Sequence, residues 1–257
     1  MLLAIDIGNS SIDLGVFDAD GKLCVTSKIS SLCPRSPDEY AVLTDGILRL
    51  NHIDRSDITD CILCSVVPSL TAPVREAVTL LTGILPPEVG PGMKTGLRIH
   101  VDDPTQLGAD IVANAVAALA VLPPPFVVID VGSATTFTVV DEKGSLEGVI
   151  IAPGVRMSLH ALSTDAAKLS DVSLVLPRQL IARNTRDSMN AGVLYGHAMM
   201  IDGMLDGIAR EMKLASVPAI LTGGLAGVVL PCCTHSMLHK PELTLTGLLE
   251  IYRKNRK

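Results

Sequence analysis

Hydrophobic and polar positions follow the same order in the two halves of the chain. In each half, three apolar or alternating segments of strand length are separated by turn residues such as Asp18-Ala19-Asp20-Gly21 and Glu142-Lys143-Gly144. This pattern predicts an antiparallel meander in each half. The expected strands are residues 2–7, 12–18 and 23–29, then residues 126–131, 135–140 and 146–151.

Helical segments are predicted after each meander. One is expected to begin near Ser36, because Asp38 and Glu39 would then occupy a first turn whose dipole favours acids. Asp103 followed by Pro104 has the form of a helix start, with a capping side chain before proline. The expected helices are residues 37–51, 70–81, 105–122, 153–162, 185–212 and 242–255, with further strands at 61–67 and 217–221.

A run of three prolines at 123–125 ends the helix before it and is the best candidate for a boundary. It divides the chain into an N-terminal half, residues 1–122, and a C-terminal half, residues 123–257. Because each half contains a meander followed by helices, the pattern favours an α/β sandwich of two similar halves over one singly wound sheet.

Two strands end in the same acid-glycine sequence. The first reads Asp6-Ile7-Gly8-Asn9-Ser10-Ser11, and the second reads Asp130-Val131-Gly132-Ser133-Ala134-Thr135-Thr136. A glycine permits a tight turn, and small residues let a polyphosphate approach the backbone N–H groups, while the acid can hold a cation. The repeat predicts two phosphate loops aimed at one cleft, and its alternative is a pair of ordinary β-turns.

Composition excludes several classes of function. The 257 residues carry a net charge of −6 and no Trp, with 2% aromatic residues, so non-specific nucleic-acid binding and base stacking are not expected. The longest apolar run, residues 115–122, is far shorter than the roughly 18–20 residues of a membrane span. Asp6 interrupts the first apolar run and no basic region precedes it, so no secretory signal is expected. We expect a soluble, cytoplasmic protein.

Six cysteines are too few for a disulfide scaffold in a chain of this length. Cys61-x-x-Cys64 has zinc or redox spacing, but it lies in a predicted strand and no second pair completes it. Cys232 and Cys233 are adjacent, which suits neither motif, so we expect reduced structural thiols. Apolar residues form a stripe along the helix expected at 185–212, which predicts a core or a subunit interface. They are Met189, Val193, Met200, Met204 and Ile208.

Eight short blocks, in order along essentially the whole chain, resemble the type III pantothenate kinases. Each block alone is a weak signal, but the set is specific. The blocks are Asp6-Ile7-Gly8-Asn9-Ser10, Ser65-Val66-Val67-Pro68, Gly90-Pro91-Gly92-Met93-Lys94-Thr95-Gly96-Leu97, Gly108-Ala109-Asp110, Asp130-Val131-Gly132-Ser133-Ala134-Thr135-Thr136, Asn184-Thr185, Thr222-Gly223-Gly224-Leu225-Ala226 and Leu243-Thr244-Leu245-x-Gly247-Leu248.

The resemblance implies an actin-like and Hsp70-like ATPase fold, shared with acetate kinase and built from two ribonuclease-H-like halves. It implies a homodimer with the substrate pocket near the interface, and ATP-dependent phosphorylation of pantothenate to 4′-phosphopantothenate, the first step toward coenzyme A. It also implies Mg²⁺ with the nucleotide and a monovalent cation, K⁺ or NH₄⁺.

The resemblance also implies site roles. Asp6 would orient Mg²⁺ and the γ-phosphate, Asp130 would bind the monovalent cation, and Asp110 would act as general base. The alternative for Asp110 is a carboxylate on a helix surface. The nucleotide residues would be Ile7, Gly8, Asn9, Ser10, Ser11, Ile12, Asp13, Ser133, Gly223 and Gly224, and the acceptor residues Val101, Gly108, Ala109, Ile111 and Thr185.

Four positions depart from the family pattern. Ile111 stands where the family has an arginine for the pantothenate carboxylate, and Val101 where it often has a tyrosine. Ser133 replaces a threonine, and Thr138 stands where aspartate is common. Loss of a charged hydrogen bond costs about 1.5–3 kcal/mol, which is roughly 10- to 100-fold in kcat/KM.

Three hypotheses therefore stay open. In the first, the protein is a pantothenate kinase in which Arg98, Lys94 or a residue of a partner chain binds the carboxylate. In the second, it is a non-catalytic or weakly catalytic paralogue that binds nucleotide as the partner of a competent subunit. In the third, it phosphorylates a pantothenate-like acceptor without a carboxylate, which an apolar Ile111 and Val101 would suit.

Overall fold

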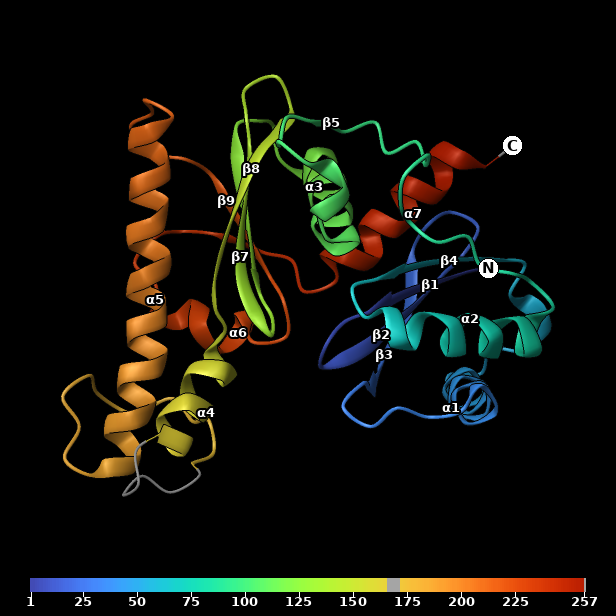
Figure 1. The fold of residues 1–257 in the computed structure, drawn as a ribbon, viewed down its shortest axis with the longest axis horizontal. Coiled ribbons are helices and arrows are strands. Elements are labelled where there is room, and N and C mark those ends of the chain that lie inside the picture. The colour runs from blue at the N-terminus through green and yellow to red at the C-terminus, as the bar shows by residue number, and fades with distance from the viewer. Residues whose placement is uncertain (166–171, 257) are drawn as a thin grey trace. The chain divides into compact units, whose positions relative to one another are not determined.

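A computed structural model describes residues 1–165 and 172–256 of the chain (Figure 1). The chain forms two compact units. Unit 1 comprises Met1–Leu97, Asp102–Val121 and Leu243–Lys257, and unit 2 comprises Arg98–Val101 and Leu122–Glu242.

Unit 1 contains a four-stranded sheet in the order β3-β2-β1-β4. The strands β1, β2 and β3 form the expected antiparallel meander, whereas β4 pairs with β1 in parallel. The strands are β1 (Leu2–Ile7), β2 (Ser11–Phe17), β3 (Leu23–Ser30) and β4 (Asp60–Ser65), and the helices are α1 (Pro37–Leu50), α2 (Pro68–Thr82), α3 (Ala109–Val121) and α7 (Leu243–Asn255).

Alternation along the strands divides the sheet of unit 1 into two faces. Leu3, Ile5 and Ile7 of β1 pack in one core with buried residues of α1 and α2. The opposite face of the sheet meets α7, which packs closely against α3. A Cβ at Gly247 would lie 2.0 Å from the backbone oxygen of Ala113, so only glycine lets these two helices approach this closely.

Unit 2 contains a six-stranded sheet in the order β10-β9-β6-β7-β8-β5. Its second meander, β6-β7-β8, is antiparallel, while β9, β10 and β5 join it by parallel pairing. The strands are β5 (Arg98–Ile99), β6 (Phe126–Val131), β7 (Ala134–Val140), β8 (Ser145–Pro153), β9 (Ala219–Thr222) and β10 (Leu238–His239), and the helices are α4 (Val155–Asp165), α5 (Thr185–Glu211) and α6 (Ala226–Val229).

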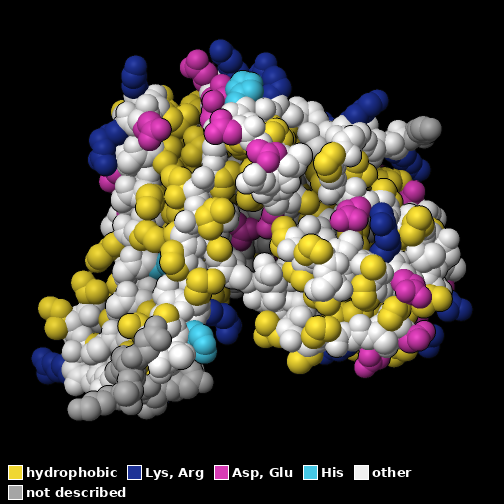
Figure 2. All heavy atoms as spheres, viewed as in Figure 1, with side chains coloured by type: hydrophobic (Ala, Val, Ile, Leu, Met, Phe, Trp, Pro, Cys, Tyr) yellow, Lys and Arg dark blue, Asp and Glu magenta, His cyan; other side chains and the backbone are white. Residues whose placement is uncertain are grey.

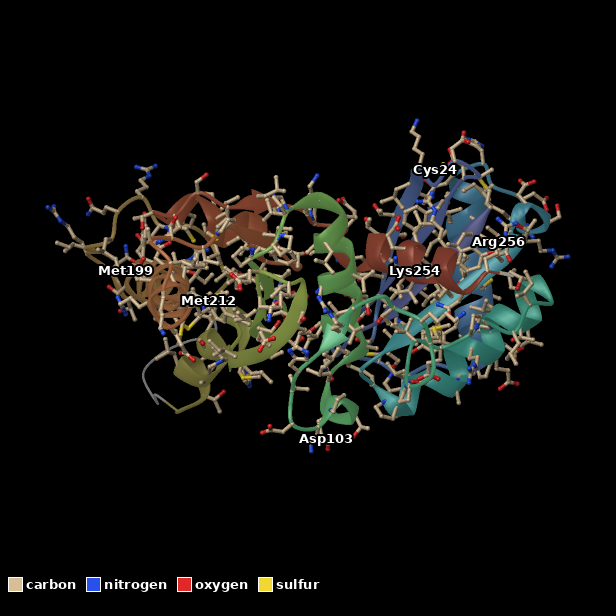
Figure 3. The ribbon with its side chains drawn as sticks, turned by 90° about the horizontal axis from the view of Figure 1, so that it is seen from above. Cys24, Asp103, Met199, Met212, Lys254 and Arg256 are labelled. Atoms are coloured by element: carbon tan, nitrogen blue, oxygen red, sulfur yellow. The ribbon has the colours of Figure 1, made fainter. Side chains whose placement is uncertain are left out.

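The long helix α5 covers one face of this sheet, together with α4 and α6 (Figure 1). Val127, Ile129 and Val131 point into this core from β6. The predicted methionine stripe belongs to the same core, because Met189, Val193 and Ile208 are buried and Met200 and Met204 pack against it. Figure 3 shows Met212 on the sheet side of α5 and Met199 on its outer side.

Two predictions differ from the structure. The helix expected from residue 105 begins at Ala109, because the Asp103 cap starts only a short 3-10 turn, Pro104–Gln106, after which Leu107 is extended. The last helix, α7, belongs to unit 1 although it follows unit 2 in sequence, since it packs on α3. The two-residue strands β5 and β10 and the short helix α6 were not expected, because such short segments carry no periodicity.

Within residues 1–165 and 172–256, the helices are too short or too polar for any of them to cross a membrane.

Candidate active site

The first acid-glycine hairpin joins β1 to β2 in unit 1. The Gly8 N–H donates to the Ser11 carbonyl at 2.9 Å, and a Cβ at Gly8 would lie 3.2 Å from that oxygen. Asn9 and Ser10 are exposed at the tip. The side chains of Ile7 and Ile12 are buried in the core with α1 and α2, so these two residues offer a ligand only their backbone.

A row of polar side chains crosses the sheet of unit 1 beside this turn. Strand register places Lys28 of β3 opposite Asp13 of β2, Asp13 opposite Asp6 of β1, and Asp6 opposite Cys64 of β4. Asp13 accepts hydrogen bonds from Ser11 Oγ at 2.6 Å and from Lys28 Nζ at 2.5 Å. The Cys64 thiol donates to Asp6 Oδ1 at 3.0 Å. We call Lys28, Asp13, Asp6 and Cys64 the acid row.

Asp110 stands in the first turn of α3, where the helix dipole favours a carboxylate. Its Oδ1 accepts a hydrogen bond from the Ile111 N–H at 2.8 Å, and a Cβ at Gly108 would lie 2.3 Å from this oxygen. Glycine at 108 is therefore the residue that lets the carboxylate fold back over the chain. Burial raises the pKa of Asp110 despite its backbone hydrogen bonds, which makes this carboxylate a better proton acceptor than an exposed aspartate.

Asp6 and Asp110 both act electrostatically on the thiol of Cys64. Burial raises the pKa of Cys64 well above its usual value, and the negative charges of Asp6 and Asp110 raise it further. Within unit 1, two of the carboxylates that the sequence singled out therefore act on one buried side chain, Asp6 by a hydrogen bond and Asp110 by its charge. Sequence reasoning missed the role of Cys64, because its contact depends on the parallel register of β1 and β4.

The Cys61-x-x-Cys64 spacing does not form a metal or redox pair. Cys61 lies in the core with α1 and α2, while Cys64 lies on the opposite face of β4 beside Asp6. Both are free thiols, as are the adjacent Cys232 and Cys233. Residues three apart on a strand point to opposite faces, so the two sulfurs have no common ligand.

The second acid-glycine hairpin joins β6 to β7 in unit 2. The Gly132 N–H donates to the Ala134 carbonyl at 3.0 Å. A Cβ at Gly154, just before α4, would lie 2.1 Å from the Ser133 carbonyl oxygen. Glycine at this position therefore lets the chain before α4 pack closely against the hairpin loop. Asp130 stands opposite Thr136 of β7 and Thr222 of β9 in the register of the sheet.

Gly223 lies against Asp130. Its φ is +95°, and a Cβ there would lie 2.4 Å from Asp130 Oδ1 and 2.6 Å from the backbone of Val131. The next residue, Gly224, is exposed, and a Cβ there would meet nothing within 4 Å. The glycine turn after β9 and the acid of the second hairpin are thus in contact within unit 2.

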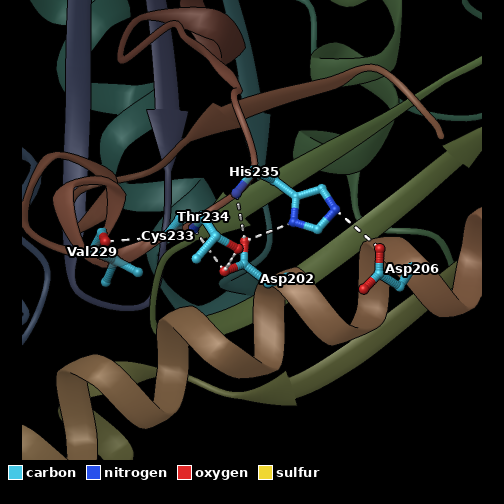
Figure 4. A network of polar contacts seen from close by, with 6 residues as sticks. All are labelled: Asp202, Asp206, Val229, Cys233, Thr234 and His235. Carbon is cyan, nitrogen blue, oxygen red and sulfur yellow. Dashed lines mark hydrogen bonds and ion pairs between the residues drawn. The ribbon is translucent and has the colours of Figure 1, made fainter.

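Two polar anchors tie this region to α5. Thr135, in the second hairpin, is within 2.8 Å of His197 Nε2, and burial lowers the pKa of His197, which favours the neutral imidazole. Asp202 accepts hydrogen bonds from both the backbone N–H and the hydroxyl of Thr234, each at 2.7 Å (Figure 4).

His235 completes the second anchor. Its Nδ1 is 3.0 Å from Asp202 Oδ1 and its Nε2 is 3.1 Å from Asp206 Oδ1 (Figure 4). Burial opposes ionisation of Asp202, but the hydrogen bonds from Thr234 and His235 outweigh it and lower the pKa. These anchors carried no sequence signal, because the partners lie far apart in the chain.

The residues expected for the acceptor fall in both units. Gly108, Ala109 and Ile111 lie beside Asp110 in unit 1, and the Ile111 side chain is only 9% exposed. Val101 is half-buried in unit 2, and Thr185 is exposed at the start of α5, after the Asn184 cap.

The cations suggested as substitutes for the missing arginine belong to different units. Arg98 belongs to unit 2, where its guanidinium donates to the Lys143 carbonyl. Lys94 belongs to unit 1, where its backbone pairs with the side chain of Asn255.

Solved structures of other proteins share the fold. Component A of (R)-2-hydroxyglutaryl-CoA dehydratase from Acidaminococcus fermentans matches 98% of this chain and 96% of its own, at 13% identity and a TM-score of 0.58. A putative 2-dehydro-3-deoxygalactonokinase from Sinorhizobium meliloti matches 100% of this chain and 97% of its own, at 15% identity and a TM-score of 0.58. The expected α/β fold of actin-like and Hsp70-like ATPases, with two ribonuclease-H-like halves, is confirmed.

Sequence comparison identifies the family. A family model described as type III pantothenate kinase matches residues 2–207. The type III pantothenate kinase of Shouchella clausii is 41% identical over 255 residues, covering 99% of this chain and all of its own. That of Geotalea daltonii is 41% identical over 256 residues, covering 100% of this chain and 99% of its own. The chain belongs to the type III pantothenate kinase family.

Proposed function

We propose that this protein transfers the γ-phosphoryl group of ATP to pantothenate, giving 4′-phosphopantothenate and ADP. Membership of the family supports a kinase. The observation that carries the residue-level proposal lies in unit 1, where the Cys64 thiol donates to Asp6 and the charge of Asp110 raises the pKa of the same thiol. It links the proposed nucleotide-binding acid to the proposed base.

The chemistry assigned to the chain is positioning and proton transfer. The Asp110 carboxylate accepts the proton of the acceptor's hydroxyl group. As this proton leaves, the hydroxyl oxygen bonds to the γ-phosphorus, and the bond between the γ-phosphorus and the oxygen that stays with ADP breaks. A desolvated carboxylate with a raised pKa suits this step, because it binds the proton more tightly than an exposed one. The turn from Gly8 to Asp13 would wrap around the phosphates, and the Gly8 N–H, which donates to the Ser11 carbonyl, would hold its shape.

The residues of the acid row fit a magnesium nucleotide. Asp6 offers the hard carboxylate oxygen that Mg²⁺ prefers, and Lys28 offsets the charge of the neighbouring Asp13. Across residues 1–165 and 172–256, no three acid, histidine or cysteine side chains gather into a metal site, so phosphates would supply part of the coordination. Bound Mg²⁺ would neutralise charge that develops on the transferring phosphoryl group.

Unit 2 carries nucleotide candidates of its own. We assign Ser133 to a phosphate and the Gly223-Gly224 turn to the adenosine. Asp130 would hold the monovalent cation, K⁺ or NH₄⁺, since Thr136 and Thr222 stand opposite it in the strand register and oxygen donors suit such a cation.

One observation favours a second candidate function. Ile111, which replaces the arginine of the family pattern, is apolar and 9% exposed, and therefore offers no charge to a carboxylate. An acceptor such as pantetheine, which has the same hydroxyl but lacks the carboxylate, would avoid leaving an anion unpaired. Val101, the other apolar replacement, fits the same interpretation.

We further propose a homodimer that works in coenzyme A synthesis in the cytoplasm, with a heteromer as the alternative assembly. Figure 2 shows hydrophobic side chains exposed where α5 lies in unit 2. Exposed apolar residues of this kind mark many subunit interfaces. Among the residues of unit 2 that the structure describes, the most exposed large apolar side chains are Met199 on α5 and, on other elements and loops, Ile151, Met157, Val175 and Ile181.

The test is transfer of labelled γ-phosphate from ATP to pantothenate and, separately, to pantetheine. Preference for pantothenate supports the main proposal, and preference for pantetheine supports the second candidate. Failure with both acceptors contradicts both, and rescue by a second family member would then identify a partner subunit. Ile111→Arg should lower KM for pantothenate and leave KM for pantetheine unchanged, while Asp110→Asn controls for contaminating kinases.

A further inference from the structure

Cys64 is a buried thiol that belongs to none of the sequence motifs assigned to nucleotide or acceptor. It stands at the end of the acid row, opposite Asp6 in the parallel register of β1 and β4. We propose that Cys64 is a positioning residue whose thiol holds the Asp6 carboxylate in the orientation that meets the nucleotide-bound metal. The proposal rests on the function proposed above and names a residue that controls its metal site.

The geometry makes the thiol a donor to Asp6. Cys64 Sγ is 3.0 Å from Asp6 Oδ1, and the side chain is fully buried, with 0% exposure. An ionised carboxylate has only acceptors, so the proton between these two atoms is that of the thiol. A hydrogen bond to a charged acceptor is stronger than one between neutral groups, and low local polarity strengthens it further.

The neighbours of Asp6 explain why its orientation needs a fixed donor. Asp13 stands opposite it in the next strand, and like charges opposite each other repel. Lys28 and Ser11 bind Asp13 and hold it on its own side of the row. On the other side of Asp6, the Cys64 thiol holds the Asp6 carboxylate in the same way. Each of the two carboxylates in the row therefore has a neighbouring donor.

The same strand supplies a matched control. Cys61 is also buried, but it faces the core with α1 and α2, where its thiol lies 4.0 Å from Thr82 Oγ1. Replacement of either cysteine by alanine removes the same volume from β4. Only the replacement at Cys64 removes a donor from Asp6, so a difference in metal-dependent binding isolates the hydrogen bond from packing.

The experiment measures binding of ADP by calorimetry, with Mg²⁺ and with EDTA, for the wild type, Cys64→Ala, Cys64→Ser and Cys61→Ala. We expect Cys64→Ala to weaken binding of ADP with Mg²⁺ about tenfold, as for one hydrogen bond to a charged group, and to change binding in EDTA much less. Cys64→Ser keeps a donor and should recover most of the loss. Cys61→Ala should bind ADP as the wild type does while lowering Tm.

Equal binding by Cys64→Ala and the wild type in Mg²⁺ would overturn the proposal, as would a serine variant as weak as the alanine variant. If Cys64→Ala does not fold, Cys64→Val keeps the buried volume without a donor and replaces it in the series. The calorimetric experiment uses no acceptor. Failure of pantothenate to react would therefore refute the proposed function while leaving the role of Cys64 to be decided by the binding data.

A second measurement uses the intact thiol. The infrared S–H stretching band of Cys64, assigned by its loss in Cys64→Ser, should shift when ADP binds with Mg²⁺, because the metal draws charge from Asp6. The band should stay in place when ADP binds in EDTA. A band that Mg²⁺ does not move would contradict a link between this thiol and the metal site.

Discussion

The two acid-glycine hairpins share a backbone plan but differ in what surrounds the acid. Each places an aspartate two residues before glycine at the end of an apolar strand, opposite an antiparallel partner. In unit 1, Asp6 stands in a row with a second carboxylate, a lysine and a thiol. In unit 2, Asp130 stands between two threonines in register, with Gly223 against its carboxylate.

From this difference we propose a division of labour between the two repeated loops. A carboxylate in a row with other charged groups suits a divalent metal on a triphosphate, because the charged side chains of the row must be held in fixed positions until the ligand arrives. A carboxylate among hydroxyls, covered by a glycine, suits a weakly held monovalent cation. In this proposal the backbone of the motif makes the turn, and the neighbouring strands decide which cation the acid would bind.

The largest expected effect tests Asp110 as the proposed base. Asp110→Asn should lower kcat about 10²–10⁴-fold, because amide nitrogen and oxygen accept a hydroxyl proton poorly. Asparagine Oδ1 can still accept from the Ile111 N–H. The raised pKa of Asp110 means that the folded state binds its proton more tightly than the unfolded state, so the charge costs stability above the ordinary carboxyl pKa.

For this reason Asp110→Asn should leave Tm at neutral pH equal to or above that of the wild type while activity is lost. Steady-state kinetics and thermal unfolding check the two halves of this expectation. A variant with near-normal kcat would remove Asp110 from the reaction.

The next effect tests the glycine that covers Asp130. Gly223→Ala should destabilise unit 2 by about 1–3 kcal/mol, because its φ is +95° and the new Cβ would meet Asp130 and the backbone of Val131. Gly224→Ala is the matched control, since a Cβ there meets nothing within 4 Å. Urea unfolding should separate the two variants, and equal stabilities would argue against the contact with Asp130.

The smallest effect concerns the anchor on α5 and depends on pH. The pKa of Asp202 is lowered in the folded protein, so its contribution is fully present above the ordinary carboxyl value of about 3.9 and is lost as pH falls through the folded pKa. When the pH is lowered from about 5 to about 2, the free energy of unfolding should therefore fall less for Asp202→Asn than for the wild type.

Urea midpoints across this range measure the effect. Asp206→Asn is the control, because the Asp206 side chain is 58% exposed and its removal should change the curve little. Parallel curves for the wild type and Asp202→Asn would contradict the anchor.

The sequence predicted most strands well because their signal is local. Alternation and turn residues placed β1, β2 and β3 within one or two residues of their observed bounds, and the same holds for β6 and β7. The start of α3 was wrong because the signal at Asp103 and Pro104 is also local, and it says nothing about the extended Leu107 that follows.

The candidate site was only partly predictable for the same physical reason. Asp6, Asp110 and Asp130 carry sequence signals, since each stands in a short motif next to glycine. Lys28 and Cys64 do not, because their roles depend on the register of β3 and β4 against the first hairpin. Likewise, the contact of Gly223 with Asp130 arises from parallel pairing of strands far apart in the chain.

The most direct test of the account compares the two hairpin acids in one assay. Phosphoryl transfer from ATP is measured against Mg²⁺ and against K⁺ concentration for the wild type, Asp6→Asn and Asp130→Asn. Asp6→Asn should lower kcat about 10²–10³-fold and raise the Mg²⁺ requirement, while Asp130→Asn should change mainly the K⁺ dependence. If instead Asp130→Asn raises the Mg²⁺ requirement and Asp6→Asn leaves it unchanged, the proposed division of labour between the hairpins is wrong.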